Sequence, residues 1–244
     1  MNKLPRLTAA FWTQKIAATT LGETAGDLLS MTLGLGYAAS SALLLTGFAA
    51  VLLLQLRSRS YRPAIYWTVI LATSTGGTTL SDLMDRTLGL GYPAGAAMLL
   101  SALALLFAAW RATGEPLSVD GAMTRRSELF YWATILISNT LGTAVGDFLA
   151  DSSGLGFAGG ALLVGALLAA VLVLYAATAA SRVGLFWAAF VLTRPFGAQV
   201  GDVLTKSHEK GGLDLGTVGS SAVLLGVLLA LVVREERERV SAEA

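Results

Sequence analysis

The sequence has no cysteine, one histidine (His208) and few charged residues, which make up 14% of the chain against 55% hydrophobic residues. Without thiols the chain cannot build a thiolate metal site or an iron–sulfur cluster, and a single histidine excludes a bis-histidine haem. A Ser-His-Asp hydrolase would have to use His208, which lies in a divergent loop. We therefore expect that the protein is not an enzyme and that its chemistry rests on carboxylate and hydroxyl oxygens.

Long uncharged runs predict a membrane protein. Four runs of 19 residues or more carry no charge: Tyr37–Leu56, Thr87–Trp110, Gly154–Ser181 and Leu215–Val233. About 20 helical residues cross the hydrocarbon core of a bilayer, and these runs lack the alternation of barrel strands. Four further segments of helical length, 11–31, 66–84, 130–150 and 186–204, are less apolar. The fold class predicted is an all-α polytopic membrane protein with eight transmembrane helices.

One sequence unit is repeated four times along the chain. Each copy has a tryptophan, a glycine ten residues later and an aspartate fifteen residues later; the tryptophans are Trp12, Trp67, Trp132 and Trp187. We divide the chain into repeats at 1–62, 63–115, 129–182 and 183–244, with a cytoplasmic linker at 116–128. Each unit contains two helices, so all copies share one orientation. The repeats are therefore expected to be parallel, pseudo-four-fold about an axis along the membrane normal.

The distribution of basic residues predicts the topology. Twelve lysines and arginines fall on the side of the termini, and only Arg86, Lys206 and Lys210 fall on the other side. Cytoplasmic loops of membrane proteins carry such an excess, so both termini are expected in the cytoplasm. The four tryptophans then begin their helices at the cytoplasmic surface, where indole rings act as interface anchors.

Polar residues gather on one face of each first helix. The candidate substrate-binding or ion-binding residues are Glu23, Asp27, Asp82, Asp147, Asp202, Thr19, Ser74, Asn139 and Arg194. Such a stripe turns toward a bundle interior or a water-filled cavity, because polar groups facing lipid would lack partners. Carboxylate oxygens suit hard cations, so the five acids Glu23, Asp27, Asp82, Asp147 and Asp202 form a hypothetical metal site.

Two residues break the repeat. Glu23 has Thr78, Thr143 and Ala198 at the matching positions, and Arg194 is the one basic residue at its own. A buried arginine needs a partner, so we expect it to pair with Glu23 or Asp27 across the bundle axis and to gate a path there.

Small residues run beside the polar stripe and predict close helix packing. They are Gly22, Gly26, Gly77, Gly142, Gly146, Gly197 and Gly201. Small residues four apart let helix backbones approach closely. We therefore expect the four first helices to surround the central axis, touching at these glycines. The second helices, rich in leucine, alanine and valine, are expected outside them.

A glycine-leucine motif follows each first helix. It reads LGLGY at 33–37 and 88–92, SGLGF at 153–157, and LDLGT at 213–217 after an insertion. Together with GETAGD (22–27), GTTLSD (77–82), GTAVGD (142–147) and GAQVGD (197–202), the four tryptophan-bearing units resemble the DUF347 repeat family of bacterial membrane proteins. The resemblance covers nearly the whole chain and implies a bacterial inner-membrane setting. The family has no known function, so the resemblance implies no chemistry.

These features predict a transporter of a small cation, either a hard divalent metal such as Mn²⁺ or a cationic solute, with proton coupling as an option. The cation is expected as a substrate rather than a cofactor, and the lipid bilayer as a partner. No nucleic-acid partner is expected, and a homo-oligomer is left open. Two alternatives remain: a structural or interaction protein whose repeated aspartates stabilise the glycine-rich turns, and an ion channel.

Overall fold

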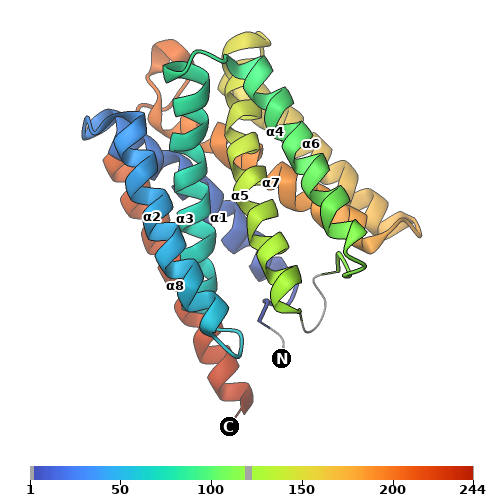
Figure 1. The fold of residues 1–244 in the computed structure, drawn as a ribbon. Helices are drawn as coiled ribbons and strands as arrows, with labels where there is room; N and C mark the ends of the chain where they lie inside the picture. Colours follow the sequence, from blue (N-terminus) through green and yellow to red (C-terminus); the bar gives the residue numbers. More distant parts are fainter. Residues whose placement is uncertain (1–2, 119–122, 244) are drawn as a thin grey trace.

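The computed structural model describes residues 3–118 and 123–243, and all regular structure within these ranges is helical. Each of the first three repeats is a long helix, a short π-helical turn and a second long helix (Figure 1). The long helices are α1 (Ala9–Asp27), α2 (Gly36–Arg57), α3 (Pro63–Asp82), α4 (Tyr92–Ala112), α5 (Arg125–Asp147), α6 (Gly156–Ala177), α7 (Arg182–Thr205) and α8 (Thr217–Glu243).

The first helix of every repeat starts with a local capping signal. The side chains of Thr8, Thr124 and Ser181 accept hydrogen bonds from backbone N–H groups in the first turns of α1, α5 and α7. Such caps satisfy N–H groups that have no partner within the helix. In α3, Pro63 stands at the first position, where its missing N–H costs nothing.

The helices form two layers. The inner helices α1, α3, α5 and α7 pack in a closed order, each against the next, with α7 returning to α1. The outer helices α2, α4, α6 and α8 pack against α3, α5, α7 and α1, so each covers the inner helix of the following repeat. This is the placement that the polar stripe and glycines predict. The ends of the chain lie at one end of the bundle (Figure 1).

Burial separates the two layers. Of the 18 residues that form the most apolar stretch of each outer helix, only 17–22% are buried. In the corresponding stretches of α5 and α7, 61% and 50% of the residues are buried. Six helices of the described part are long and apolar enough to cross a membrane: the four outer helices, α5 with its following turn, and α7. The exposed apolar outer surface would be unfavourable in water, so the chain is a membrane protein. Helices α1 and α3 carry more polar residues, and most of these are buried in the bundle.

The same glycine contact recurs where each inner helix meets the next. In each inner helix, the glycine ten residues after the tryptophan faces a side chain of the next inner helix. That side chain stands seven residues after the tryptophan of its own helix. The pairs are Gly22 with Ser74, Gly77 with Asn139, Gly142 with Arg194 and Gly197 with Thr19. One turn further, Gly26, Gly146 and Gly201 face Thr78, Ala198 and Glu23. All seven glycines that were predicted to pack helices therefore lie at close helix contacts.

The tryptophans also lie between repeats. The aromatic residue before each tryptophan packs on the tryptophan of the next inner helix, with ring centroids 5.5–6.0 Å apart. Trp67, Trp132 and Trp187 are 2%, 0% and 6% exposed, and Trp12 is half-buried. Burial among neighbouring rings contradicts the anchor role predicted for these three indoles, because they do not face the lipid surface. Their apolar area instead joins adjacent repeats.

The glycine-leucine motif forms a tight turn. Three inner helices continue into five π-helical residues, and the following glycines have φ values of +66° to +79°. Glycine adopts this conformation without the Cβ clash of other residues. In the fourth repeat, Asp214 replaces the first glycine at φ +55°, and Gly216 keeps φ +71°. The motif therefore retains its conformation there, despite the different sequence.

The repeated aspartates do not hold these turns. The backbone N–H groups of Leu33, Leu88 and Ser153 donate to the carbonyl oxygens five residues earlier, on Leu28, Leu83 and Phe148. Within the described ranges, the aspartate side chains contact basic side chains rather than turn N–H groups.

Replacement of Gly142 by alanine should destabilise the bundle. A Cβ at Gly142 would lie 2.5 Å from the Cβ and 2.3 Å from the Cγ of Arg194, so the two helices must move apart. Overpacking of this kind costs about 1–3 kcal/mol. Gly226→Ala is the matched control, because nothing lies within 4 Å of a Cβ there. Thermal unfolding in detergent should show a lower midpoint for Gly142→Ala only; equal midpoints for both variants would contradict the close approach.

Candidate functional site

The four repeated aspartates form a buried layer near one end of the inner helices. Asp27, Asp82 and Asp147 are the last residues of α1, α3 and α5, and Asp202 lies three residues before the end of α7. All four are 2–4% exposed. We call this set the acidic layer. Like charges at close range repel strongly away from water, so the layer requires compensating groups.

Two basic side chains compensate the acidic layer, and each joins two repeats. The Lys206 Nζ lies 2.5 Å from Asp27 Oδ2 and 3.1 Å from Asp202 Oδ1. The Arg86 Nε lies 2.8 Å from Asp82 Oδ1, and its Nη2 lies 3.3 Å from Asp147 Oδ2. The contacts with Asp82 Oδ1 and Asp202 Oδ1 are ion pairs without hydrogen-bond alignment.

Lys206 stays charged in this setting. Burial by itself disfavours the ammonium form, but the carboxylates of Asp202 and Asp27 outweigh burial and hold the pKa of Lys206 above its ordinary value.

Arg86 and Lys206 were not among the site residues expected from the sequence. The available signal was their spacing, since both stand four residues after the repeated aspartate, a separation that places side chains on one helix face. Met31 and Asp151 occupy the matching positions in repeats 1 and 3. The bases of repeats 2 and 4 therefore serve all four aspartates.

A second polar centre lies one helical turn further into the bundle. The Arg194 Nη2 is 2.8 Å from Glu23 Oε2, 2.6 Å from Thr78 Oγ1 and 2.5 Å from Thr143 Oγ1. These partners come from the other three inner helices. The predicted pairing of Arg194 with Glu23 is therefore confirmed. Glu23 and Arg194 lie on α1 and α7, however, which are neighbouring helices. The guanidinium reaches the centre from α7, so the pair does not span the bundle axis as was expected.

The remaining residues of the predicted stripe lie at the level of the Arg194 backbone. Thr19 donates to the carbonyl oxygen of Thr193 at 3.2 Å, and Asn139 Nδ2 donates to Thr73 Oγ1 at 2.9 Å. Ser74 Oγ is buried and has no hydrogen-bond partner. Sequence equivalence thus places these side chains in one layer, but Thr19 and Asn139 have different partners and Ser74 Oγ has none.

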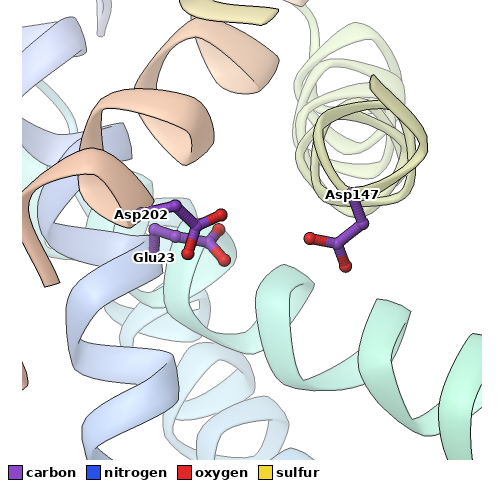
Figure 2. A group of neighbouring side chains, drawn as sticks. All are labelled: Glu23, Asp147 and Asp202. Carbon is purple, nitrogen blue, oxygen red and sulfur yellow. The ribbon is translucent and has the colours of Figure 1, made fainter. Parts of the chain in front are cut away.

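Three carboxylates converge between the two centres. Oxygen atoms of Glu23, Asp147 and Asp202 lie within 4.8 Å of one another, and all three side chains are buried. In Figure 2 they point from three helices toward one shared space. We call them the carboxylate cluster. It contains three of the five acids of the hypothetical metal site; Asp27 and Asp82 lie outside it. Carboxylate oxygens at this separation suit a hard cation.

The axis is densely packed on the side of the termini. At the position three residues after each tryptophan stand Lys15, Ile70, Ile135 and Phe190, all 0% exposed. The Lys15 Nζ lies 4.0 Å from the centroid of the Phe190 ring and 3.4 Å from Asn139 Oδ1. Lys15 therefore points into the bundle rather than toward the surface. One turn nearer the termini, the hydroxyls of Tyr66 and Tyr131 are 2.7 Å apart.

The Glu23–Arg194 pair should show strong coupling in stability. Glu23→Gln alone leaves a buried guanidinium without a charge partner, which costs roughly 3–5 kcal/mol. Arg194→Gln alone should cost a similar amount, and the double variant should recover most of the loss. Thermal or denaturant unfolding in detergent measures this, with Arg111→Gln on the exposed surface as the control. Additive losses in the double variant would contradict the coupling.

Comparison with known families assigns the chain to one of them. The family described as Repeat of Unknown Function (DUF347) matches four consecutive segments, residues 10–61, 65–115, 130–181 and 185–237. No curated protein and no solved structure matches the chain. The four matched segments cover most of each of the eight long helices, and together they span most of the sequence. The chain therefore belongs to the DUF347 repeat family.

Proposed function

We propose that this protein transports a small cation, a hard divalent metal such as Mn²⁺ or a cationic solute, along the axis of the inner helices. The carboxylate cluster is the observation that carries the proposal. Glu23, Asp147 and Asp202 converge in the interior. An ionisable group inside a membrane bundle is costly and by default indicates an ion or substrate path.

The charge balance supports a cationic substrate. Glu23 and the acidic layer supply five carboxylates, whereas the basic side chains that pair with them, Arg86, Arg194 and Lys206, supply three positive charges. A divalent cation that enters the cluster would complete this balance. It would compete with Arg86 for Asp147 and with Lys206 for Asp202, because those carboxylates are shared. Protons could exchange at the same carboxylates, which gives a route to proton coupling.

The two ends of the axis differ in how they are closed. Toward the termini, packed side chains fill the axis from the level of Lys15 to that of Tyr66 and Tyr131, one helical turn away. Toward the other end, Arg86 and Lys206 cover the acidic layer, and their side chains are 32% and 19% exposed. Movement of these two side chains would open the cluster on that side first. Access from the cytoplasm requires the inner helices to separate, as in alternating access.

The membrane arrangement forms part of the proposal. All eight long helices would cross a bacterial inner membrane, with α1 and α3 counted as spans because they lie beside α5 and α7 in the closed order of inner helices. The four repeats would be pseudo-four-fold about an axis along the membrane normal. Both termini would be cytoplasmic, as the basic residues predict.

A structural role is the main alternative. The ion pairs of Arg86 and Lys206 each link two repeats, and pairs of this kind can fix the order of helices in a bundle. That reading predicts no cation flux at all.

A channel predicts flux that saturates weakly and needs no driving gradient other than that of the cation.

Removal of one carboxylate from the cluster should abolish most uptake. Purified protein in liposomes that contain an Mn²⁺-quenched dye reports Mn²⁺ entry. Asp147→Asn and Asp202→Asn should lower the initial rate at least about tenfold, because the loss of even an indirect ligand partner costs 10–100-fold in metal affinity. Asp151→Asn is the matched control, since Asp151 is exposed and, within the described part of the chain, accepts a hydrogen bond only from the Tyr92 hydroxyl at 3.2 Å.

Equal rates for the cluster variants and the parent, with folding verified by size exclusion and thermal unfolding, would contradict the site. If liposomes with the parent protein admit neither Mn²⁺ nor organic cations faster than empty liposomes, the structural alternative holds.

Reporter fusions test the proposed orientation. A fluorescent protein that matures only in the cytoplasm should be bright when fused after Ala244, and alkaline phosphatase should be inactive there. The same reporters inserted at Gly211, in the loop between α7 and α8, should give the reverse pattern. Active phosphatase at the C-terminus would contradict the orientation.

A further inference from the structure

One of the four junctions between inner helices is not closed by its outer helix. Near its end, each outer helix has one residue that is equivalent between repeats. In repeats 1 to 3 this residue stands 43 positions after the tryptophan of the same repeat, and in repeat 4 the loop insertion places it five positions later. The equivalent residues are Gln55, Trp110, Tyr175 and Glu235.

Gln55, Trp110 and Glu235 pack into the bundle or bond to it. Gln55 is 1% exposed and Trp110 is 0% exposed, with the Trp110 ring 5.8 Å from that of Trp187. Glu235 accepts hydrogen bonds from Gln14, Tyr61 and Trp67 at 2.8–3.0 Å. Tyr175, in contrast, is 55% exposed. The end of α6 and the start of α7 project from the bundle at the right of Figure 1.

The displaced end of α6 leaves a groove of about 1020 Å³ between α6, α7 and α1. Its lining is mainly apolar and includes Trp12, Ile16, Leu172, Phe186 and Ala189. Trp12 is the repeat tryptophan that stays half-buried, and among the described residues Tyr175 makes no ring contact with it like that between Trp110 and Trp187. The groove therefore opens toward the hydrocarbon of the membrane.

Two arginines stand at the mouth of the groove. Arg6 and Arg182 both line it and both are exposed. Within the described ranges neither guanidinium pairs with a carboxylate. Arg182 lies over the Tyr175 ring, 4.3 Å from its centroid. From Arg182 to Thr193, which also lines the groove, α7 rises about 16 Å, roughly half of a 30 Å hydrocarbon core.

We propose that this groove binds one anionic phospholipid from the leaflet on the side of the termini. Its acyl chain would lie against Trp12, Phe186 and Ala189, and its phosphate would bind Arg6 and Arg182. The depth of one leaflet fits this occupant, and so do the two guanidinium groups at the mouth, neither of which has a carboxylate partner within the described ranges. The Arg182 guanidinium donates a hydrogen bond to the carbonyl oxygen of Tyr175. A second copy of the chain fits less well, because a two-fold contact would bring the same arginines together. The inference is independent of the transport proposal.

Native mass spectrometry of the full-length protein in detergent tests the inference. Phosphatidylglycerol and phosphatidylcholine with identical acyl chains serve as probes. The parent should retain one phosphatidylglycerol at concentrations about tenfold below those needed for phosphatidylcholine. Arg6→Gln with Arg182→Gln should remove this preference, with Arg59→Gln and Arg111→Gln together as the charge-matched control. Ala189→Trp should fill the groove and prevent retention of both lipids, whereas Ala104→Trp, on the exposed face of α4, should not.

Thermal unfolding gives a second readout and controls for misfolding. Phosphatidylglycerol should raise the unfolding midpoint of the parent and of Ala104→Trp, but not that of Ala189→Trp, whose midpoint without lipid should match that of the parent within a few degrees. Retention that is indifferent to head group and unaffected by Ala189→Trp would overturn the proposal. A dimer that Ala189→Trp abolishes would also overturn it, because the groove would then hold a second copy.

Discussion

Where inner helices meet, a glycine backbone of one helix lies against the side chain seven residues after the tryptophan of the next. The contact recurs four times and closes the bundle. Close backbone approach lets helices pack in a membrane, where burial from water provides no drive between them. It also brings Arg194 near enough to reach Glu23, Thr78 and Thr143 at once, with Gly142 providing the space.

The buried charges depend on this packing. In a low-dielectric interior an unpaired charge is costly, and the pairing is divided unequally among the repeats. Repeats 2 and 4 supply Arg86 and Lys206, while repeats 1 and 3 supply only aspartates to the layer. Glu23 and Arg194 break the repetition at the deeper level. The chain thus uses an almost repetitive framework to hold a polar interior that is not repetitive.

The same departure from repetition explains the two features with functional interest. The interior carries more carboxylates than basic groups, which suits a visiting cation. At the outer surface, Tyr175 differs from its buried equivalents Gln55 and Trp110, and a groove opens toward lipid beside Trp12. Both features lie where one repeat fails to match the others, because identical repeats would fill every junction in the same way.

The sequence alone determined the four units, the layer of first helices inside and the glycine contacts, because spacing and hydrophobic pattern are local and repeat along the chain. It also predicted that Arg194 pairs with Glu23 or Asp27, since a buried arginine requires a carboxylate, and the structure shows that the partner is Glu23. Only the tertiary structure decided that Arg86 and Lys206 bridge aspartates of adjacent repeats and that three tryptophans are buried. Those outcomes depend on distances between helices remote in sequence, which no local pattern encodes.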